Sequence, residues 1–224
     1  MIKVVIFDLD DTLISEKSFA LSAFGEISIE LSKVIKKPIS VIYEELVSLY
    51  NESPNYIFNR ILEKNNIHLN KNFIDDLIYI YRNHKPNIKL SDEVIELLLH
   101  LKKSEFHLGL ITDGFKSTQI NKVISLELDK YIEKIVITDE LGDNREFWKP
   151  SEKPYTIIKD YFNVEYNEMI YIGDNINKDF IAPIKLGMQY ALYINENSHY
   201  QKTEIKENLG QSISHLNDVL KLIR

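Results

Sequence analysis

Short hydrophobic runs along the chain predict buried β-strands. There are five such runs: Ile2–Phe7, His107–Ile111, Lys134–Ile137, Glu168–Ile172 and Gln189–Ile194. Polar residues do not alternate with apolar ones inside them, which is typical of parallel strands covered on both faces. Helical patterns lie between the last four runs, for example Ile120, Val123 and Ile124, or Tyr155, Ile158 and Phe162. Strands that alternate with helices predict an α/β fold with a doubly wound, Rossmann-like parallel sheet of about five strands.

The long stretch between the first two runs shows helical patterns and no strand signal. One of its apolar stripes consists of Phe73, Leu77 and Ile80. We therefore expect an all-helical cap domain at residues 15–85. This domain would be inserted into an α/β core domain that comprises residues 1–14 and 86–224.

Small polar residues predict where several helices begin. Ser40 and Ser53 are expected to cap two helices of the insertion, the second with Pro54 at its first position. Ser91 is expected to cap the helix that follows the insertion. A weak amphipathic pattern over Leu216–Ile223 predicts a last helix that closes the edge of the sheet.

Composition and charge narrow the possible functions. The 224 residues include 27 Lys and Arg against 34 Asp and Glu, a net charge of −7, which argues against nucleic-acid or anionic-membrane partners. There is no cysteine, so a metal must be held by oxygen or imidazole ligands. The first apolar run is too short for a signal peptide or a membrane span, and we expect a cytoplasmic protein.

Acidic residues follow the first predicted strand. Ligands of open α/β sheets bind at the carboxyl ends of the strands, so residues at these positions are candidates for chemistry. Asp8 and Asp10 have the spacing of one face of an extended segment. Two such carboxylates can share a hard cation or divide the roles of nucleophile and acid–base catalyst, although an acidic turn would have the same sequence.

Three further polar clusters follow later strands. Thr112, Asp113 and Gly114 precede a helix and could form an anion cradle, or simply cap that helix. Lys149 could hold a phosphate or neutralise a carboxylate, although most lysines are only solvated. After the fourth strand come Gly173, Asp174 and Asp179, where the carboxylates could ligate a cation or serve as helix caps.

The four clusters, in this order on successive strands, resemble the motifs of the haloacid dehalogenase superfamily, whose members are mostly Mg²⁺-dependent phosphatases. Asp8-Leu9-Asp10-Asp11-Thr12 is similar to the first motif, Thr112 to the second and Lys149 to the third. Gly173-Asp174 with Asp179 is similar to the fourth. The resemblance extends from Ile2 to about Ile194, and the helical insertion resembles the cap domain of one subgroup.

The resemblance implies a role for each of these residues. Asp8 would attack phosphorus to form an aspartyl-phosphate, and Asp10 would act as acid and then as base. Mg²⁺ would be held by Asp8, the backbone carbonyl of Asp10 and Asp174. Asp179 would hold Lys149 or a metal-bound water. The phosphoryl group would be bound by a further set of residues: Thr112, Asp113, Gly114 and Lys149.

Two residues depart from the pattern of the superfamily. Asp11 stands where many relatives carry glycine, and Asp113 stands where many carry asparagine. The role of this extra negative charge is left open. Asp10 favours phosphoryl transfer over dehalogenation, because relatives that displace halide lack an acid at that position.

The function that we expect is hydrolysis of a small phosphate monoester, such as a sugar phosphate or a nucleotide monophosphate. One alternative is a phosphomutase of the same fold, which Asp11 weighs against because mutases usually carry the glycine. A catalytically idle binding or regulatory protein is the other alternative. We expect a small-molecule partner and a monomer or homodimer, with no nucleic-acid or membrane partner.

Overall fold

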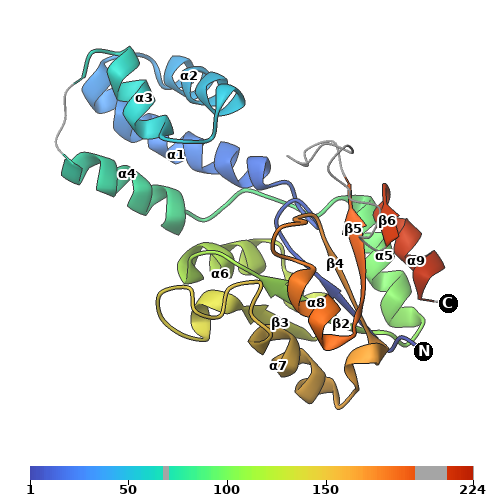
Figure 1. Ribbon diagram of the computed structural model, residues 1–224. Coiled ribbons are helices and arrows are strands. Elements are labelled where there is room, and N and C mark those ends of the chain that lie inside the picture. Colours follow the sequence, from blue (N-terminus) through green and yellow to red (C-terminus); the bar gives the residue numbers. More distant parts are fainter. Residues whose placement is uncertain (68–70, 195–210, 224) are drawn as a thin grey trace. The chain divides into compact units, whose positions relative to one another are not determined.

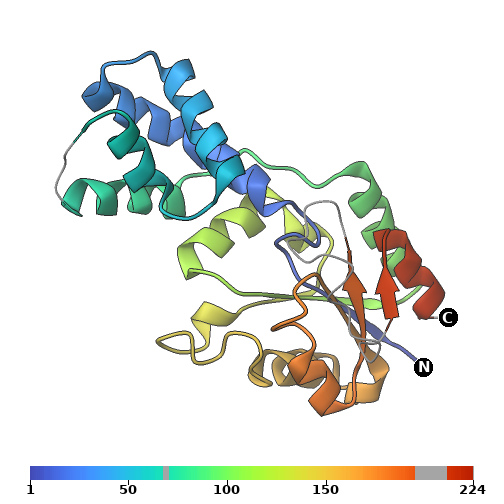
Figure 2. The same ribbon diagram turned by 45° about the horizontal axis from the view of Figure 1, so that its top comes forward.

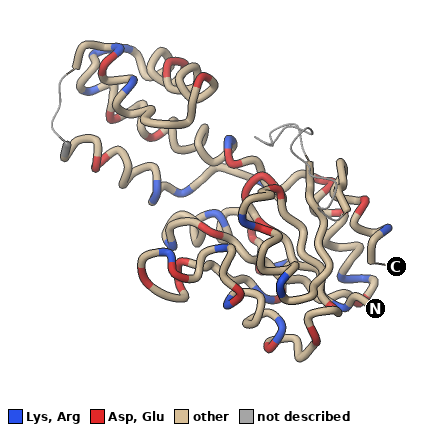
Figure 3. The backbone as a smooth tube through the Cα atoms, in the orientation of Figure 1, with Lys and Arg blue, Asp and Glu red and all other residues tan. Residues whose placement is uncertain are grey.

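The structure is a computed structural model in which residues 1–67, 71–194 and 211–223 are described. The chain forms two compact units, of which the first comprises Met1–Glu16 and Lys89–Arg224. The second unit is Lys17–Ile88. Acidic and basic residues are interspersed along both units (Figure 3).

A parallel sheet forms the centre of the first unit (Figure 1). Its strands are β1 (Val4–Phe7), β2 (His107–Thr112), β3 (Lys134–Ile137), β4 (Met169–Gly173), β5 (Gln189–Tyr193) and β6 (Gln211–Ile213). The strand order is β3-β2-β1-β4-β5-β6, and every neighbouring pair is parallel. The predicted doubly wound α/β fold is therefore confirmed. The sheet has one more strand than expected, because β6 is only three residues long and gives no apolar run in the sequence.

Helices cover both faces of this sheet. They are α5 (Asp92–Lys103), α6 (Lys116–Ser125), α7 (Lys153–Phe162), α8 (Ile181–Leu186) and α9 (Val219–Leu222). Figure 2 shows α7 and α8 on one face and α5, α6 and α9 on the other. The α7 and α8 face packs Tyr155, Ile158 and Phe180 against the buried side chains of β1 and β4. Coverage on both faces explains why every residue of β1 and β4 is buried.

Two sequence predictions concern the helices α5 and α9 of the first unit. Ser91 caps α5 as predicted, because its hydroxyl accepts a hydrogen bond from the Val94 N–H at 3.3 Å. The predicted last helix begins as a short 3₁₀ turn at Leu216–Asp218 and continues as α9. In the described residues the sheet edge beyond β5 is occupied by β6 rather than by this helix.

Four helices make up the secondary structure of the described part of the second unit. The first of them begins one residue before this unit, at Glu16, which belongs to the first unit. The helices are α1 (Glu16–Ile35), α2 (Ile39–Glu52), α3 (Ile57–Lys64) and α4 (Lys71–Asn83). Their apolar faces share one core. No helix among the described residues is long and apolar enough to cross a membrane.

The predicted helix starts of this unit are wrong. Ser40 lies inside α2, which begins after Pro38, whose fixed φ of −56° suits a helix entry. Ser53 ends α2 instead of starting α3, and its hydroxyl accepts a hydrogen bond from the Asn55 N–H. Pro54 therefore lies in a turn before α3, which follows Tyr56 in a left-handed conformation.

Candidate active site

Asp8 is a buried carboxylate at the carboxyl end of β1. Its side chain is only 4% exposed. The backbone N–H of Asp8 continues the sheet by donating to the Ile172 carbonyl of β4 at 2.8 Å. One carboxylate oxygen, Oδ1, accepts hydrogen bonds from the Leu9 N–H at 2.8 Å and from Lys149 Nζ at 2.9 Å. Burial with charge-assisted partners fixes the orientation of this carboxylate.

Lys149 joins two of the predicted site residues. Its Nζ lies 2.9 Å from Asp8 Oδ1 and 2.8 Å from Asp179 Oδ1, and it also donates to the Tyr171 hydroxyl at 2.9 Å. Burial disfavours the charge of this side chain, but Asp179 and Asp8 outweigh that effect and raise the pKa of Lys149 well above its ordinary value. Lys149 is therefore a cation with three fixed partners.

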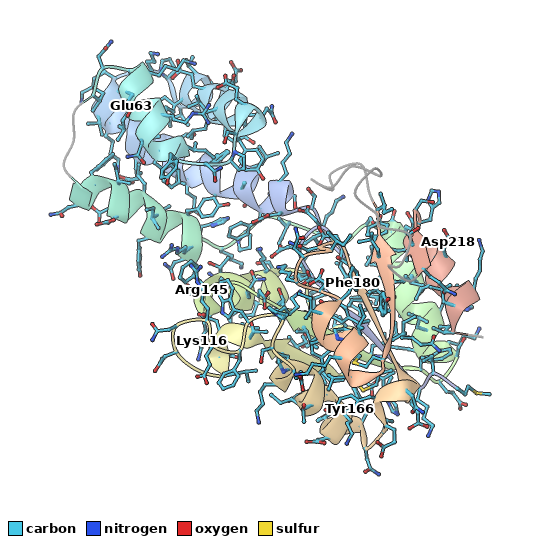
Figure 4. All side chains as sticks on the ribbon, in the orientation of Figure 1. Glu63, Lys116, Arg145, Tyr166, Phe180 and Asp218 are labelled. Carbon is cyan, nitrogen blue, oxygen red and sulfur yellow. The ribbon has the colours of Figure 1, made fainter. Side chains whose placement is uncertain are left out.

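Asp179 is held at the start of the segment that leads into α8, one residue before Phe180 (labelled in Figure 4). Its Oδ1 pairs with Lys149, and its Oδ2 accepts a hydrogen bond from the Asn175 N–H at 2.9 Å. A Cβ on Gly173 would overlap the Asp179 carboxylate. Glycine at position 173 is therefore needed for close approach of a side chain rather than for an unusual backbone conformation.

Asp8, Asp174 and Asp179 form a cluster of carboxylates. One oxygen from each lies within 4.8 Å of the others. Unit charges at that separation repel by on the order of 3 kcal/mol at an effective dielectric constant of ~20. Burial, followed by the charges of Asp8 and Asp179, raises the pKa of Asp174 from 3.8 to about 8. The cluster is thus an incompletely compensated site of hard oxygen ligands, which suits Mg²⁺.

Asp10 points to a different set of partners from those of Asp8. Both of its carboxylate oxygens are bound by Lys122 Nζ, at 2.6 and 2.7 Å. Gln119 Nε2 donates to Asp10 Oδ2 at 3.1 Å. The Asp10 side chain is 23% exposed, whereas that of Lys122 is only 3% exposed. The Asp10 side chain is therefore more accessible than that of Asp8, and its partners Gln119 and Lys122 both lie on α6.

The loop after β2 combines a buried hydroxyl with a glycine turn. The Thr112 side chain is fully buried and accepts a hydrogen bond from Gln119 Nε2. Gly114 has φ +139°, a conformation that L side chains rarely adopt. Within the described parts of the chain, the backbone N–H groups of Asp113 and Gly114 donate to no backbone or side-chain oxygen. These groups suit the binding of phosphoryl oxygens.

The Asp113 carboxylate has structural partners. Its Oδ1 accepts hydrogen bonds from the Thr138 hydroxyl at 2.8 Å and from the Lys149 N–H at 3.0 Å. Its Oδ2 lies 3.4 Å from Lys178 Nζ. The carboxylate therefore ties the loop after β2 to the segment that carries Lys149, and any contact of Asp113 with phosphate falls to its backbone N–H.

Three residues of this site were not singled out from the sequence. Gln119 and Lys122 lie on α6 with the i, i+3 spacing of one helix face, and Lys178 immediately precedes Asp179. Polar residues that recur at i, i+3 directly after an anion-binding loop were the available signal. The apolar pattern of Ile120, Val123 and Ile124 drew attention to the opposite side of the helix, where Ile124 is 63% exposed.

Comparisons with known proteins identify a family and a fold that the chain resembles. A model of the haloacid dehalogenase-like hydrolase family matches residues 5–193. The chain is 27% identical over 228 residues to a glyceraldehyde 3-phosphate phosphatase of Pyrococcus abyssi, covering 100% of this chain and 94% of the relative.

Solved structures share the fold. A HAD phosphatase from Thermococcus onnurineus has a TM-score of 0.62 at 20% identity, covering 99% of this chain and 98% of the other. A 2-haloacid dehalogenase from Pseudomonas syringae has a TM-score of 0.65 at 21% identity, covering 100% and 98%. Because phosphatases and a dehalogenase share this fold, the fold alone does not select the reaction.

Proposed function

Because the chain belongs to the haloacid dehalogenase-like hydrolase family, we propose that it is a phosphatase that hydrolyses small phosphate monoesters through an aspartyl-phosphate on Asp8. The observation that supports this most is the environment of Asp8. Its carboxylate is buried, paired with Lys149, and placed next to Asp174 and Asp179. Such a group is oriented for nucleophilic attack, and the neighbouring Asp174, whose pKa is raised by burial and by the charges of Asp8 and Asp179, suits a bound cation.

Mg²⁺ is the cofactor that the site residues suit. Asp8, Asp174 and the backbone carbonyl of Asp10 would hold it. Asp179 already has a partner on each oxygen, which favours a supporting role for that residue. The bound ion would neutralise the carboxylate cluster and stabilise negative charge on the phosphoryl group.

The residues of the chain divide the remaining work. Lys149 and the Leu9 N–H orient Asp8 through Oδ1, so that the carboxylate meets phosphorus in one geometry. The backbone N–H groups of Asp113 and Gly114, with the Thr112 hydroxyl, bind the phosphoryl oxygens. Asp10 gives a proton to the leaving alkoxide and then takes one from the water that cleaves the aspartyl-phosphate.

Phosphatase chemistry is favoured over dehalogenation by Asp10. A departing halide needs no proton, whereas a departing alkoxide does. The partial exposure of Asp10, in contrast to the burial of Asp8, is consistent with a group that exchanges protons with substrate and water. Because a relative is a glyceraldehyde 3-phosphate phosphatase, glyceraldehyde 3-phosphate is the first substrate to assay.

The test is release of free phosphate from 4-nitrophenyl phosphate and from a panel of phosphorylated metabolites that includes glyceraldehyde 3-phosphate. We expect turnover in Mg²⁺ and its loss in a chelator. Asp8→Asn should lower turnover by a factor of about 10³ or more. The matched control is Asp160→Asn, because Asp160 is an exposed residue of the same unit, 66% accessible. Full turnover by Asp8→Asn would exclude Asp8 as the nucleophile.

A further inference from the structure

We propose that Lys122 and Gln119 of α6 are positioning residues, which hold the Asp10 carboxylate and the Thr112 hydroxyl in their reactive orientations. This inference rests on the proposed phosphatase function. It assigns a task to two buried polar side chains that the reaction steps above leave unused.

The Lys122 ammonium hydrogen-bonds to both carboxylate oxygens of Asp10. The distances of 2.6 and 2.7 Å from one Nζ are those of strong charge-assisted hydrogen bonds. The Lys122 side chain is almost fully buried, so this ion pair is shielded on the lysine side from solvent competition. A carboxylate held at both oxygens has one side-chain rotamer, whereas a half-exposed carboxylate without such a partner samples several.

Gln119 links the acid to the phosphate-binding loop. The two hydrogens of its Nε2 are shared among three acceptors, which are Asp10 Oδ2, the Thr112 hydroxyl oxygen and the Asp113 carbonyl oxygen. Since the Thr112 oxygen accepts this bond, the hydrogen of its own hydroxyl is directed to another acceptor, such as a phosphoryl oxygen. One amide therefore sets the geometry of two groups that meet the substrate at different atoms.

Gly114 provides an independent sign that Gln119 has a defined place. A Cβ at position 114 would lie 3.0–3.3 Å from three atoms of the Gln119 side chain. The loop and the side chain are thus packed together, in addition to the φ of +139° that favours glycine there. Burying an amide and an ammonium is costly, and apolar residues would stabilise a helix–loop contact at least as well.

The consequence for catalysis depends on the leaving group. An alkoxide needs a proton from Asp10 as the ester bond breaks, whereas 4-nitrophenolate is a weak base and leaves without one. Loss of the positioning of Asp10 should therefore slow alkyl esters far more than 4-nitrophenyl esters, whereas loss of the positioning of Thr112 adds a factor common to both. A purely structural role of α6 would slow both classes by the same factor.

The experiment compares Lys122→Met and Gln119→Met with the wild-type full chain in Mg²⁺. The measured quantity is kcat/KM for benzyl phosphate and for 4-nitrophenyl phosphate, because this ratio reports the transfer to Asp8 and not the later hydrolysis. For Lys122→Met we expect a loss of about tenfold or more with benzyl phosphate and of less than about threefold with 4-nitrophenyl phosphate. For Gln119→Met, which also releases the Thr112 hydroxyl, we expect a loss with both substrates that is about threefold or more larger with benzyl phosphate. Lys122→Arg, which keeps the charge, should recover part of the benzyl phosphate activity.

Lys116→Met is the matched control. Lys116 (labelled in Figure 4) lies on the same helix, is 59% exposed and pairs with Glu140. It should leave both kcat/KM values unchanged. Equal losses on the two substrates, or no loss, would overturn the inference. Should Lys122→Met not fold, Gln119→Met and Lys122→Arg carry the same comparison. A wild-type protein inactive on 4-nitrophenyl phosphate would contradict the proposed function instead.

Discussion

The departure of Asp11 from the glycine of many relatives has a local physical explanation. Asp11 has φ +52°, in the left-handed region that glycine enters without cost. Aspartate tolerates this region better than most residues, because its short side chain hydrogen-bonds to nearby backbone. Here Asp11 Oδ1 accepts a hydrogen bond from the Glu16 N–H at 2.9 Å, where α1 begins. The residue therefore has a conformational role in the loop.

Substitutions at Asp11 should show this role. We expect Asp11→Ala to lower the free energy of unfolding by about 1 kcal/mol more than Asp11→Gly, because both variants lose the hydrogen bond but only alanine keeps the left-handed strain. Urea denaturation of the two variants measures the difference. Equal stabilities would show that the conformation of the loop is not maintained in solution.

Asp174 should make the stability of the metal-free protein depend on pH. Its folded-state pKa of about 8 exceeds the usual 3.8, so between these pH values the folded protein binds a proton that the unfolded chain has released. Stability from this group is therefore full below pH 3.8 and is lost as pH rises to about 8. The measurement is the difference in stability between wild type and Asp174→Asn, in chelator, across this range.

Asp174→Asn and Mg²⁺ provide two comparisons for the pH dependence of stability. Asp174→Asn carries no titrating carboxyl, so its stability relative to wild type should increase with pH through the window from 3.8 to about 8. Mg²⁺ competes with the proton for the same oxygen, so its affinity for the wild type should increase with pH up to about 8. A stability difference that does not vary with pH would show that the carboxylate repulsion is relieved by another group.

At the level of elements, the strand ends could be predicted from the sequence. Asp8, Thr112 and Asp174 directly follow or end buried apolar runs, and parallel strands bring such positions to one edge of a sheet. Local pattern was sufficient there because the apolar runs of β1 and β4 are unambiguous. The lysine at position 149 is far from β1 in sequence, and no local pattern indicates its contact with Asp8.

Helix α6 shows why the rest could not be predicted. Its buried residues are Thr118, Gln119 and Lys122, the reverse of the usual amphipathic pattern. Periodicity analysis assumes that the apolar side is the inner one, and this assumption fails where a helix supports a polar site. Likewise, the engagement of the Asp113 carboxylate by Thr138 and Lys149 depends on tertiary contacts with no local signal.

Two glycines with contrasting surroundings, Gly25 and Gly173, give opposite predictions. Gly25 lies inside α1 with no atom within 4 Å of a Cβ, so Gly25→Ala should stabilise the protein by about 1 kcal/mol. Gly173→Ala adds the same methyl group where it would overlap Asp179, and should lower both stability and phosphatase activity. Thermal unfolding and phosphate release measure these effects. Activity retained in Gly173→Ala would mean that Asp179 can move without consequence.

For the whole molecule, the two units have separate cores but only one contains the proposed metal ligands. Asp8, Asp10 and Asp174 all belong to the unit of Met1–Glu16 and Lys89–Arg224. The unit of Lys17–Ile88 has its own buried cluster, which includes Phe24, Leu46 and Ile61 from three helices. The acidity of the sheet edge is therefore a local property of one unit, and a net-negative chain can still bind a phosphate ester once the cation is present.

Because the proposed metal ligands all lie in one unit, Mg²⁺ should stabilise that unit and not the other. A ligand stabilises only what must unfold to release it. Adding Mg²⁺ should therefore slow amide hydrogen exchange in β1 and β4, which lead into the carboxylates, and leave exchange in α2 and α3 unchanged. Hydrogen-exchange mass spectrometry with and without Mg²⁺ measures this, and Asp174→Asn is the control, in which the difference in β1 and β4 should vanish. Equal protection of α2 and α3 would show that the two units unfold as one, because only complete unfolding would then expose the amides of either.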